Sequence, residues 1–105
     1  MQLHELINHI GNKYNVSNEY KSGMEILLRD LDDKNMTTAV GIFVKAALSG
    51  ESAAQYVLSR LLSQGAGAEK YQDKVLEYLK KAADGGILEA QYDYAIAHIF
   101  GGHNI

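Results

Sequence analysis

The chain has 105 residues, of which 47% are hydrophobic, and this predicts one domain with a sizeable core. It contains no cysteine, which excludes a disulfide framework and a thiolate metal site and fits a reducing compartment. The net charge of −3 comes from interspersed acids and bases, without the basic stripe that nucleic-acid backbones require. No stretch approaches the ~20 apolar residues of a membrane span, and the N-terminus lacks a signal-peptide pattern, so we expect a cytoplasmic protein.

Apolar residues at helical spacing predict six helices. In chain order they are expected at 3–10, around the apolar row 20–31, and at 36–48, 52–64, 71–83 and 88–100. Gly11 is expected to end the first helix, Ser17 or Asn18 to begin the second, and Asp33 or Asn35 to cap the third. Sustained alternation of period two is absent, which argues against strands. The prediction is an all-α fold, a short α-solenoid of about three antiparallel hairpins.

One phrase occurs twice in the chain. Residues 46–56 return as residues 82–92, at an offset of 82 − 46 = 36. A fixed period of this size indicates stacked supersecondary units, each too small to bury its apolar face alone. The recurring alanines, Ala54 and Ala90, are expected where two helices nearly touch.

The second copy carries a more specific signature. GAG at 65–67 is followed by DKVLEYLKKAADGG at 73–86 and EAQY at 89–92. This glycine loop, lysine-rich helix end, glycine turn and alanine–glutamine helix start resemble the Sel-one-like repeat, a relative of the tetratricopeptide repeats. The unit 52–86 fits well, and 36–50 and 88–102 fit as partial units. The resemblance implies helical hairpins that bind other proteins rather than catalyse reactions.

The chain departs from the family pattern in several places. It has no proline, although the family's loop usually carries one, and Tyr94 and Ala95 stand where leucine and glycine are common. Residues 1–35 do not match the pattern. We therefore expect a single domain, 1–105, made of a divergent N-terminal hairpin, 1–35, and repeat-like hairpins, 36–105.

Two patterns resemble metal-binding motifs, but neither has the required spacing of ligands. His4 and His9 are five residues apart and diverge by about 140° on a helix, so they cannot share a metal ion. The acidic segment 30–35 begins like a calcium loop but has Gly41 where the bidentate glutamate belongs. No serine nucleophile with a base is evident. We expect no enzyme activity, metal, cofactor, nucleic acid or membrane contact, and no small-molecule ligand.

A partner surface is predicted from the repeat. In stacked helical repeats, the first helix of each hairpin usually lines the concave face, and the offset aligns matched positions along that face. The predicted partner-binding residues are Val57, Arg60, Gln64, Asp93, Ile96 and Phe100. The next candidate is the N-terminal segment, with Tyr20 and the acidic turn of Asp30, Asp32 and Asp33.

The last predicted helix is apolar on two sides. One apolar row comprises Leu88, Tyr92, Ala95, Ile96 and Ile99. We expect no following hairpin to cover this row. Either the tail, 101–105, folds back over the helix, or a partner covers it.

These features favour a binding protein with one compact protein partner. Small, mildly acidic, helical proteins of this kind resemble bacterial immunity proteins, which neutralise a cognate toxin that is often a basic nuclease. Electrostatic attraction would speed association with such a basic toxin domain. The alternative is an adapter or regulator within a signalling or envelope complex.

Overall fold

The structure is a computed structural model that describes residues 2–30, 32–63 and 74–99, with the backbone alone for 98 and 99. This part of the chain forms six helices and no strand, which confirms the all-α prediction. The helices are α1 (Leu3–Lys13), α2 (Asn18–Arg29), α3 (Asp33–Leu48), α4 (Ser52–Ser63), α5 (Val75–Asp84) and α6 (Leu88–Ile99).

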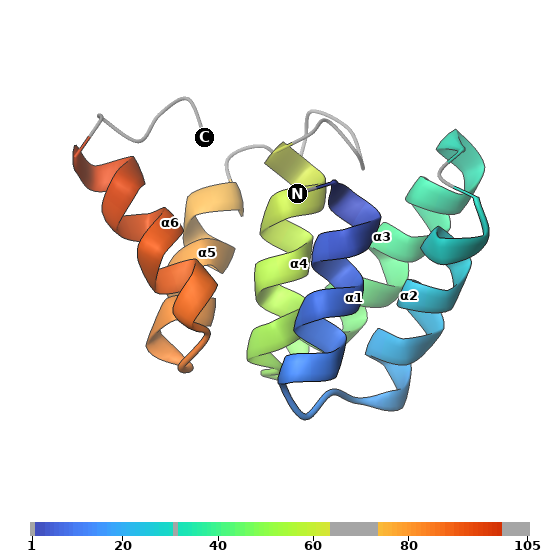
Figure 1. The fold of residues 1–105 in the computed structure, drawn as a ribbon, viewed down its shortest axis with the longest axis horizontal. Coiled ribbons are helices and arrows are strands. Elements are labelled where there is room, and N and C mark those ends of the chain that lie inside the picture. Colours follow the sequence, from blue (N-terminus) through green and yellow to red (C-terminus); the bar gives the residue numbers. More distant parts are fainter. Residues whose placement is uncertain (1, 31, 64–73, 100–105) are drawn as a thin grey trace.

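The helices lie side by side, and consecutive helices run antiparallel (Figure 1). Helices α5 and α6 form one end of the molecule and α2 and α3 the other, with α4 between them. Each helix packs against its neighbour in the sequence, and α1 packs against both α2 and α4. Within the described ranges, no helix has the length and apolar character needed to cross a membrane.

The core is centred on α4. Every side chain from Ala53 to Ser59 is buried, as are Leu61 and Leu62. A helix buried on all sides needs neighbours on all sides, and α1, α3 and α5 pack around α4. Burial of each large apolar side chain contributes about 1.5–3 kcal/mol, so α4 stabilises the fold more than its length suggests.

Helix α1 ends at Lys13, beyond the glycine that was expected to end it. Gly11 lies inside the helix, and a Cβ atom there would stand 3.0 Å from Cε1 of Tyr20 and 3.1 Å from Sδ of Met24. The prediction that Gly11 ends the helix is wrong. The residue is small because α1 and α2 cross closely at this point.

The cap of α2 agrees with the prediction, and the cap of α3 does not. The hydroxyl of Ser17 accepts a hydrogen bond from the Tyr20 N–H at 3.1 Å. Helix α3 begins three residues before the predicted position, because Asp32 is its N-cap and accepts the Asn35 N–H at 2.7 Å. A run of adjacent polar residues offered several possible caps, and spacing alone did not choose between them.

The two copies of the repeated phrase share one turn geometry. Gly50 and Gly86, 36 residues apart, both have a φ angle of 99°, which side chains rarely allow. The Gly50 N–H donates to the Ala47 carbonyl at 3.0 Å, and the Gly86 N–H donates to the Ala83 carbonyl at 3.1 Å. The sequence period is therefore a structural period at both turns.

The recurring glutamine has the same role in both copies. Nε2 of Gln55 donates to the Ala47 carbonyl at 3.2 Å, and Nε2 of Gln91 donates to the Ala83 carbonyl at 3.0 Å. Each glutamine thus adds a second hydrogen bond to the carbonyl that already accepts the N–H of the turn glycine, near the end of the preceding helix. This contact gives a physical reason for the repeated alanine–glutamine pair.

The recurring alanines are equivalent in burial. Ala54 and Ala90 are both fully buried at the starts of α4 and α6. Each follows one of the two matching turns, so each lies where its helix meets the helix before it. This agrees with the expectation that both alanines occupy close helix crossings.

Candidate protein-interaction surface

The structure separates the residues that were predicted to form one partner surface. Gln64 and Phe100 lie outside the described residues. The other four, Val57, Arg60, Asp93 and Ile96, lie on α4 and α6 and differ in exposure. They do not form one continuous outward face.

Val57 is fully buried, with 0% of its surface exposed, so the prediction that it contacts a partner is wrong. The prediction assumed that α4 keeps one open face, as the first helix of a hairpin does in an open stack. Here α1 packs against α4 in addition to α3 and α5. That extra helix leaves no apolar residue of α4 open to solvent.

Arg60 and Asp93 face one another. The Tyr56 hydroxyl donates to Oδ2 of Asp93 at 2.7 Å, and Nη1 of Arg60 stands 3.6 Å from the same oxygen. Burial and the hydrogen bond to Asp93 raise the pKa of Tyr56, which therefore stays protonated. These contacts join α4 to α6, so the two charged residues stabilise the fold, although each keeps part of its surface exposed.

Tyr20 is also unavailable to a partner, contrary to the prediction. It is fully buried, its hydroxyl donates to the Ile7 carbonyl at 2.7 Å, and its ring meets Phe43 edge-on at 5.2 Å. Burial raises the pKa of its hydroxyl, and the charge of Glu51 adds to the effect. Tyr20 fixes the packing of α1, α2 and α3.

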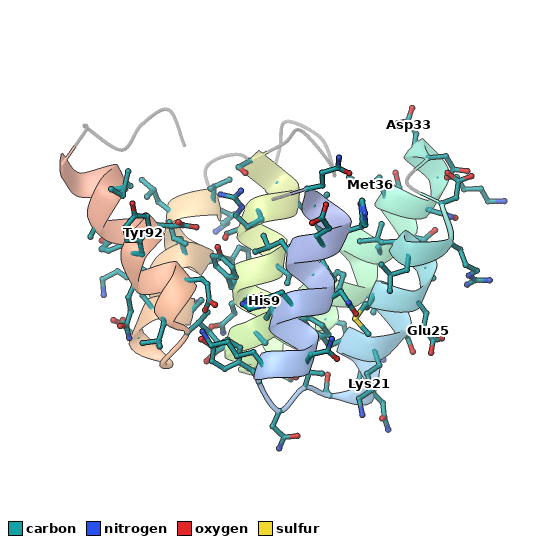
Figure 2. All side chains as sticks on the ribbon, in the orientation of Figure 1. His9, Lys21, Glu25, Asp33, Met36 and Tyr92 are labelled. Atoms are coloured by element: carbon teal, nitrogen blue, oxygen red, sulfur yellow. The ribbon has the colours of Figure 1, made fainter. Side chains whose placement is uncertain are left out.

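The acidic turn lies between α2 and α3, and its three predicted members are exposed. Asp32 caps α3, and the Asp30 carbonyl accepts Nδ2 of Asn35 at 2.9 Å. Asp33 lies at the end of the molecule opposite Tyr92 (Figure 2). The acidic turn is thus a separate surface with a structural role in helix capping.

Half of the exposed large hydrophobic side chains of the described residues lie on α6. Leu88, Tyr92 and Ile96 are exposed by 58%, 69% and 37%. Their spacing of four residues places them in one row, and the exposed Ala95 lies beside it. We call these four residues the α6 stripe. Of the predicted surface, Ile96 belongs to it.

A spacing in the sequence could have located this surface. Tyr20, Tyr56 and Tyr92 are separated by 56 − 20 = 36 and 92 − 56 = 36 residues. Their exposed fractions are 0%, 2% and 69%. The tyrosine series extends the period into the first 35 residues, and the third tyrosine alone has no covering neighbour among the described residues.

A polar cluster holds the start of α6 against α1. Oε1 of Glu89 accepts the Tyr14 hydroxyl at 2.7 Å, and Oε2 lies 2.8 Å from Nζ of Lys13 and 3.1 Å from Nε2 of His9. The Tyr14 oxygen also accepts the Leu88 N–H at 3.0 Å. One carboxylate thus joins the first helix and the loop after it to the last helix.

The cluster stabilises the charged form of Glu89. Burial alone would raise its pKa, but hydrogen bonds from Lys13, Tyr14, its own backbone and His9 outweigh this effect and lower the pKa to about 2. The hydrogen bond to Glu89 likewise raises the pKa of Lys13. Both groups are therefore charged at neutral pH, and the cluster acts as an ion-pair clamp.

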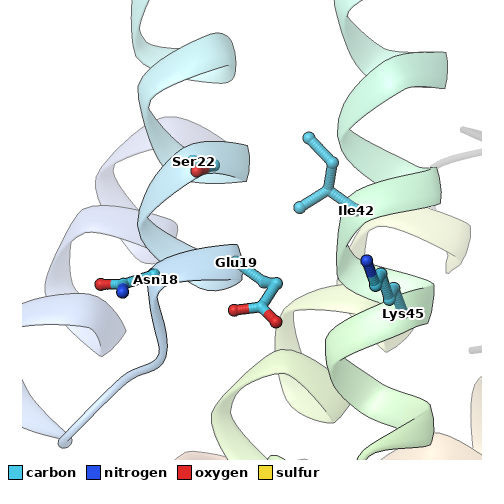
Figure 3. Close-up of a pocket in the computed structure, with 5 residues that line it drawn as sticks. All are labelled: Asn18, Glu19, Ser22, Ile42 and Lys45. Carbon is cyan, nitrogen blue, oxygen red and sulfur yellow. The ribbon is translucent and has the colours of Figure 1, made fainter.

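A shallow depression of about 400 Å³ lies between α2 and α3 (Figure 3). Its lining consists of Asn18, Glu19, Ser22, Ile42 and Lys45. Small-molecule sites enclose most of the ligand within an apolar wall. This depression is open, and three of its five side chains, those of Asn18, Glu19 and Ser22, lie exposed on α2, so it lacks that character.

Among the described residues, no group of three or more histidine, aspartate or glutamate side chains could hold a metal ion. Comparisons with protein-family models, with curated proteins and with solved structures found no match to this chain. The resemblance to the Sel-one-like repeat therefore rests on the residues quoted above.

Proposed function

We propose that this chain is a protein-interaction module that binds one protein partner through the α6 stripe. The observation that carries the proposal is the row of Leu88, Tyr92 and Ile96, which is exposed on the last described helix. Isolated exposed apolar residues are ordinary, but a continuous row marks a contact surface. Tyrosine is a typical interface anchor, with its hydroxyl adding directionality, and Leu88 and Ile96 add apolar area on either side of it.

The finer proposal is stoichiometric inhibition of a basic toxin domain by an immunity protein. The net charge of −3 supports it, because opposite charge accelerates the association of two proteins. In an adapter role, the same stripe would instead join the chain to a larger complex. The two roles share the α6 stripe and differ in the partner that it contacts.

The proposal is tested by placing the photoreactive amino acid p-benzoylphenylalanine at position 92 in the native host. We expect a specific adduct that is lost when Leu88→Ser and Ile96→Ser are added. The matched control carries the same group at position 21, because Lys21 is exposed on α2, far from Tyr92 (Figure 2). Equal adducts from positions 92 and 21, or none from 92, would refute binding through this stripe. A toxin identified in the adduct supports immunity, and a subunit of a complex supports the adapter role.

A further inference from the structure

The chain contains its own example of how a surface like the α6 stripe is covered. On α4, the residues one period earlier than the stripe are Ser52, Tyr56, Ser59 and Arg60, since 88 − 52 = 36. Three of them contact the next hairpin, α5–α6: Ser52 meets its turn, and Tyr56 and Arg60 meet Asp93. Tyr56 and Ser59 are only 2% exposed on α4, whereas Tyr92 and Ala95 are exposed on α6.

Two contacts define how the α5–α6 hairpin lies on α4. Its turn rests on the first residue of α4, because a Cβ atom on Gly85 would overlap the side chain of Ser52. Its second helix places Asp93 between the Tyr56 hydroxyl and Arg60. A turn at the helix start and a hydrogen-bond acceptor one turn further on are therefore the features of a covering hairpin.

Helix α6 begins with the same backbone geometry as α4 but carries different side chains at the matched positions. The turns that precede α4 and α6 have matching hydrogen bonds, so both helices begin with the same geometry. Leu88 replaces the smaller Ser52, and Ile96 replaces Arg60. Without Arg60, a buried carboxylate beside the tyrosine would lack its cation, so a neutral acceptor fits this position better.

We propose that the α6 stripe takes a helical hairpin of a partner protein, stacked on α6 as the α5–α6 hairpin is stacked on α4. In this arrangement the turn of the partner hairpin leaves room for Leu88. A neutral acceptor of the hairpin accepts a hydrogen bond from the Tyr92 hydroxyl, and one of its apolar side chains contacts Ile96. This inference rests on the proposed function and names the class of partner. Stacked repeats bury each unit against its neighbour, and on α4 that neighbour is a helical hairpin.

A second copy of this chain fits the stripe less well. A two-fold pairing of α6 with α6 would bury one row of three large side chains on each copy, well short of the ~800 Å² per partner of a standard interface. Head-to-tail stacking of the chain's own hairpin would press a glycine turn onto Leu88 and bring Asp93 to a position without a cation. Leu88 and Ile96 therefore favour a hairpin whose sequence differs from that of the α5–α6 hairpin.

The inference is tested by fusing a helical hairpin of known sequence to the chain directly after α6. The probe is this chain extended in register, with residues 65–105 repeated after residue 100, since 101 − 65 = 36. One version keeps the stripe, and a second carries Leu88→Ser and Ile96→Arg, which restores the residues of α4. Because the chain has no cysteine, Ala95→Cys supplies a single thiol whose maleimide labelling reports coverage, and Lys21→Cys is the exposed control.

We expect the restored version to slow labelling at position 95 by about tenfold or more and to raise the melting temperature, while the version with the original stripe changes little. Labelling at position 21 stays the same in both. Fast labelling at position 95 in both versions would overturn stacking on α6, and slow labelling in both would overturn the selection by residues 88 and 96. If a specific adduct still forms from position 92, the proposed function stands without the hairpin.

The natural partner provides the second arm of the test. The residue joined to position 92 should lie in a helix–turn–helix of the partner. An adduct with a strand or an extended loop would overturn the inference. An adduct with the chain itself, together with a dimer in sedimentation equilibrium that Tyr92→Ser dissociates, would assign the stripe to a second copy instead.

Discussion

Helices α4 and α6 begin with the same phrase and the same turn, yet one is buried on all sides and the other is open along one row. Their local hydrogen bonds agree, since Gln55 and Gln91 satisfy equivalent carbonyls. Their exposure differs because α4 has a following hairpin and α6 has none among the described residues. The local sequence determines the helix and the turn that precedes it. The helices packed around it determine which of its residues are buried and which are exposed.

The largest expected difference between the two helices is at the matched tyrosines. Tyr56→Ala should lower the free energy of unfolding by about 3–5 kcal/mol, because it empties a buried site and removes the hydroxyl that holds Asp93. Tyr92→Ala should change it by no more than about 0.5 kcal/mol, because that ring is exposed. Urea denaturation of both variants measures the difference. Equal losses would mean that α6 is covered within the chain.

The matched alanines should instead behave alike. Ala54→Leu and Ala90→Leu should each destabilise the protein by about 1–3 kcal/mol, because both positions are fully buried. Ala95→Leu on the same helix is the control and should have little effect, since Ala95 is exposed. Thermal unfolding of the three variants provides the measurement. An unchanged melting temperature for Ala90→Leu would show that α6 does not pack closely on α5.

The Glu89 clamp should make the attachment of α6 depend on pH. Glu89→Gln should cost about 1–2 kcal/mol at pH 7, because it removes the charge that Lys13 and His9 face. The folded-state pKa of about 2 lies below the ordinary value of ~4.3, so the charge contributes fully above pH ~4.5 and less as the pH falls toward 2.

Urea denaturation at pH 7 and pH 3 tests this dependence. The gap in stability between the parent and Glu89→Gln should narrow at pH 3. Glu25→Gln is the matched control, since Glu25 is exposed on α2 and has no clamp. A gap of constant size would show that the contribution of Glu89 does not depend on its charge.

The smallest expected effects concern the matched glutamines. Gln55→Ala should cost about 1–1.5 kcal/mol and Gln91→Ala about 0.5 kcal/mol, because the same hydrogen bond is buried in the first case and exposed in the second. Urea denaturation of the two single variants and the parent measures both losses in the free energy of unfolding. The reverse order would contradict the view that burial, and not local geometry, separates the two helices.

The sequence predicted the helices well because apolar rows and caps are local features. It placed six helices and the recurring buried alanines, and it narrowed the cap of α2 to Ser17 or Asn18, of which Ser17 is the cap. It misjudged Gly11 and Val57 because the surroundings of both depend on how whole helices pack against one another, which local spacing does not show. Gly11 is small where α2 crosses α1, and Val57 is buried because α1 packs against α4.

The candidate surface was predicted only in part for the same reason. The apolar row of α6 was visible in the sequence, and Ile96 was correctly placed on an exposed face. The pairing of Arg60 with Asp93 was not, because opposite charges 33 residues apart carry no local signal of contact. Arg60 and Asp93 look exposed on a helical wheel, but in the fold they pair with each other between α4 and α6.

The bond between Tyr14 and Glu89 has a consequence for how the chain folds during synthesis. The two residues are 75 positions apart, whereas most contacts in a stack of hairpins are between neighbours. Helix α1 is synthesised before α6, so its contact with Glu89 has to wait until the residues between Tyr14 and Glu89 have been made. The helices between them can pack one after another as they appear, but the clamp forms only once α6 has been made, so a single carboxylate joins the first and last described helices after the intervening ones.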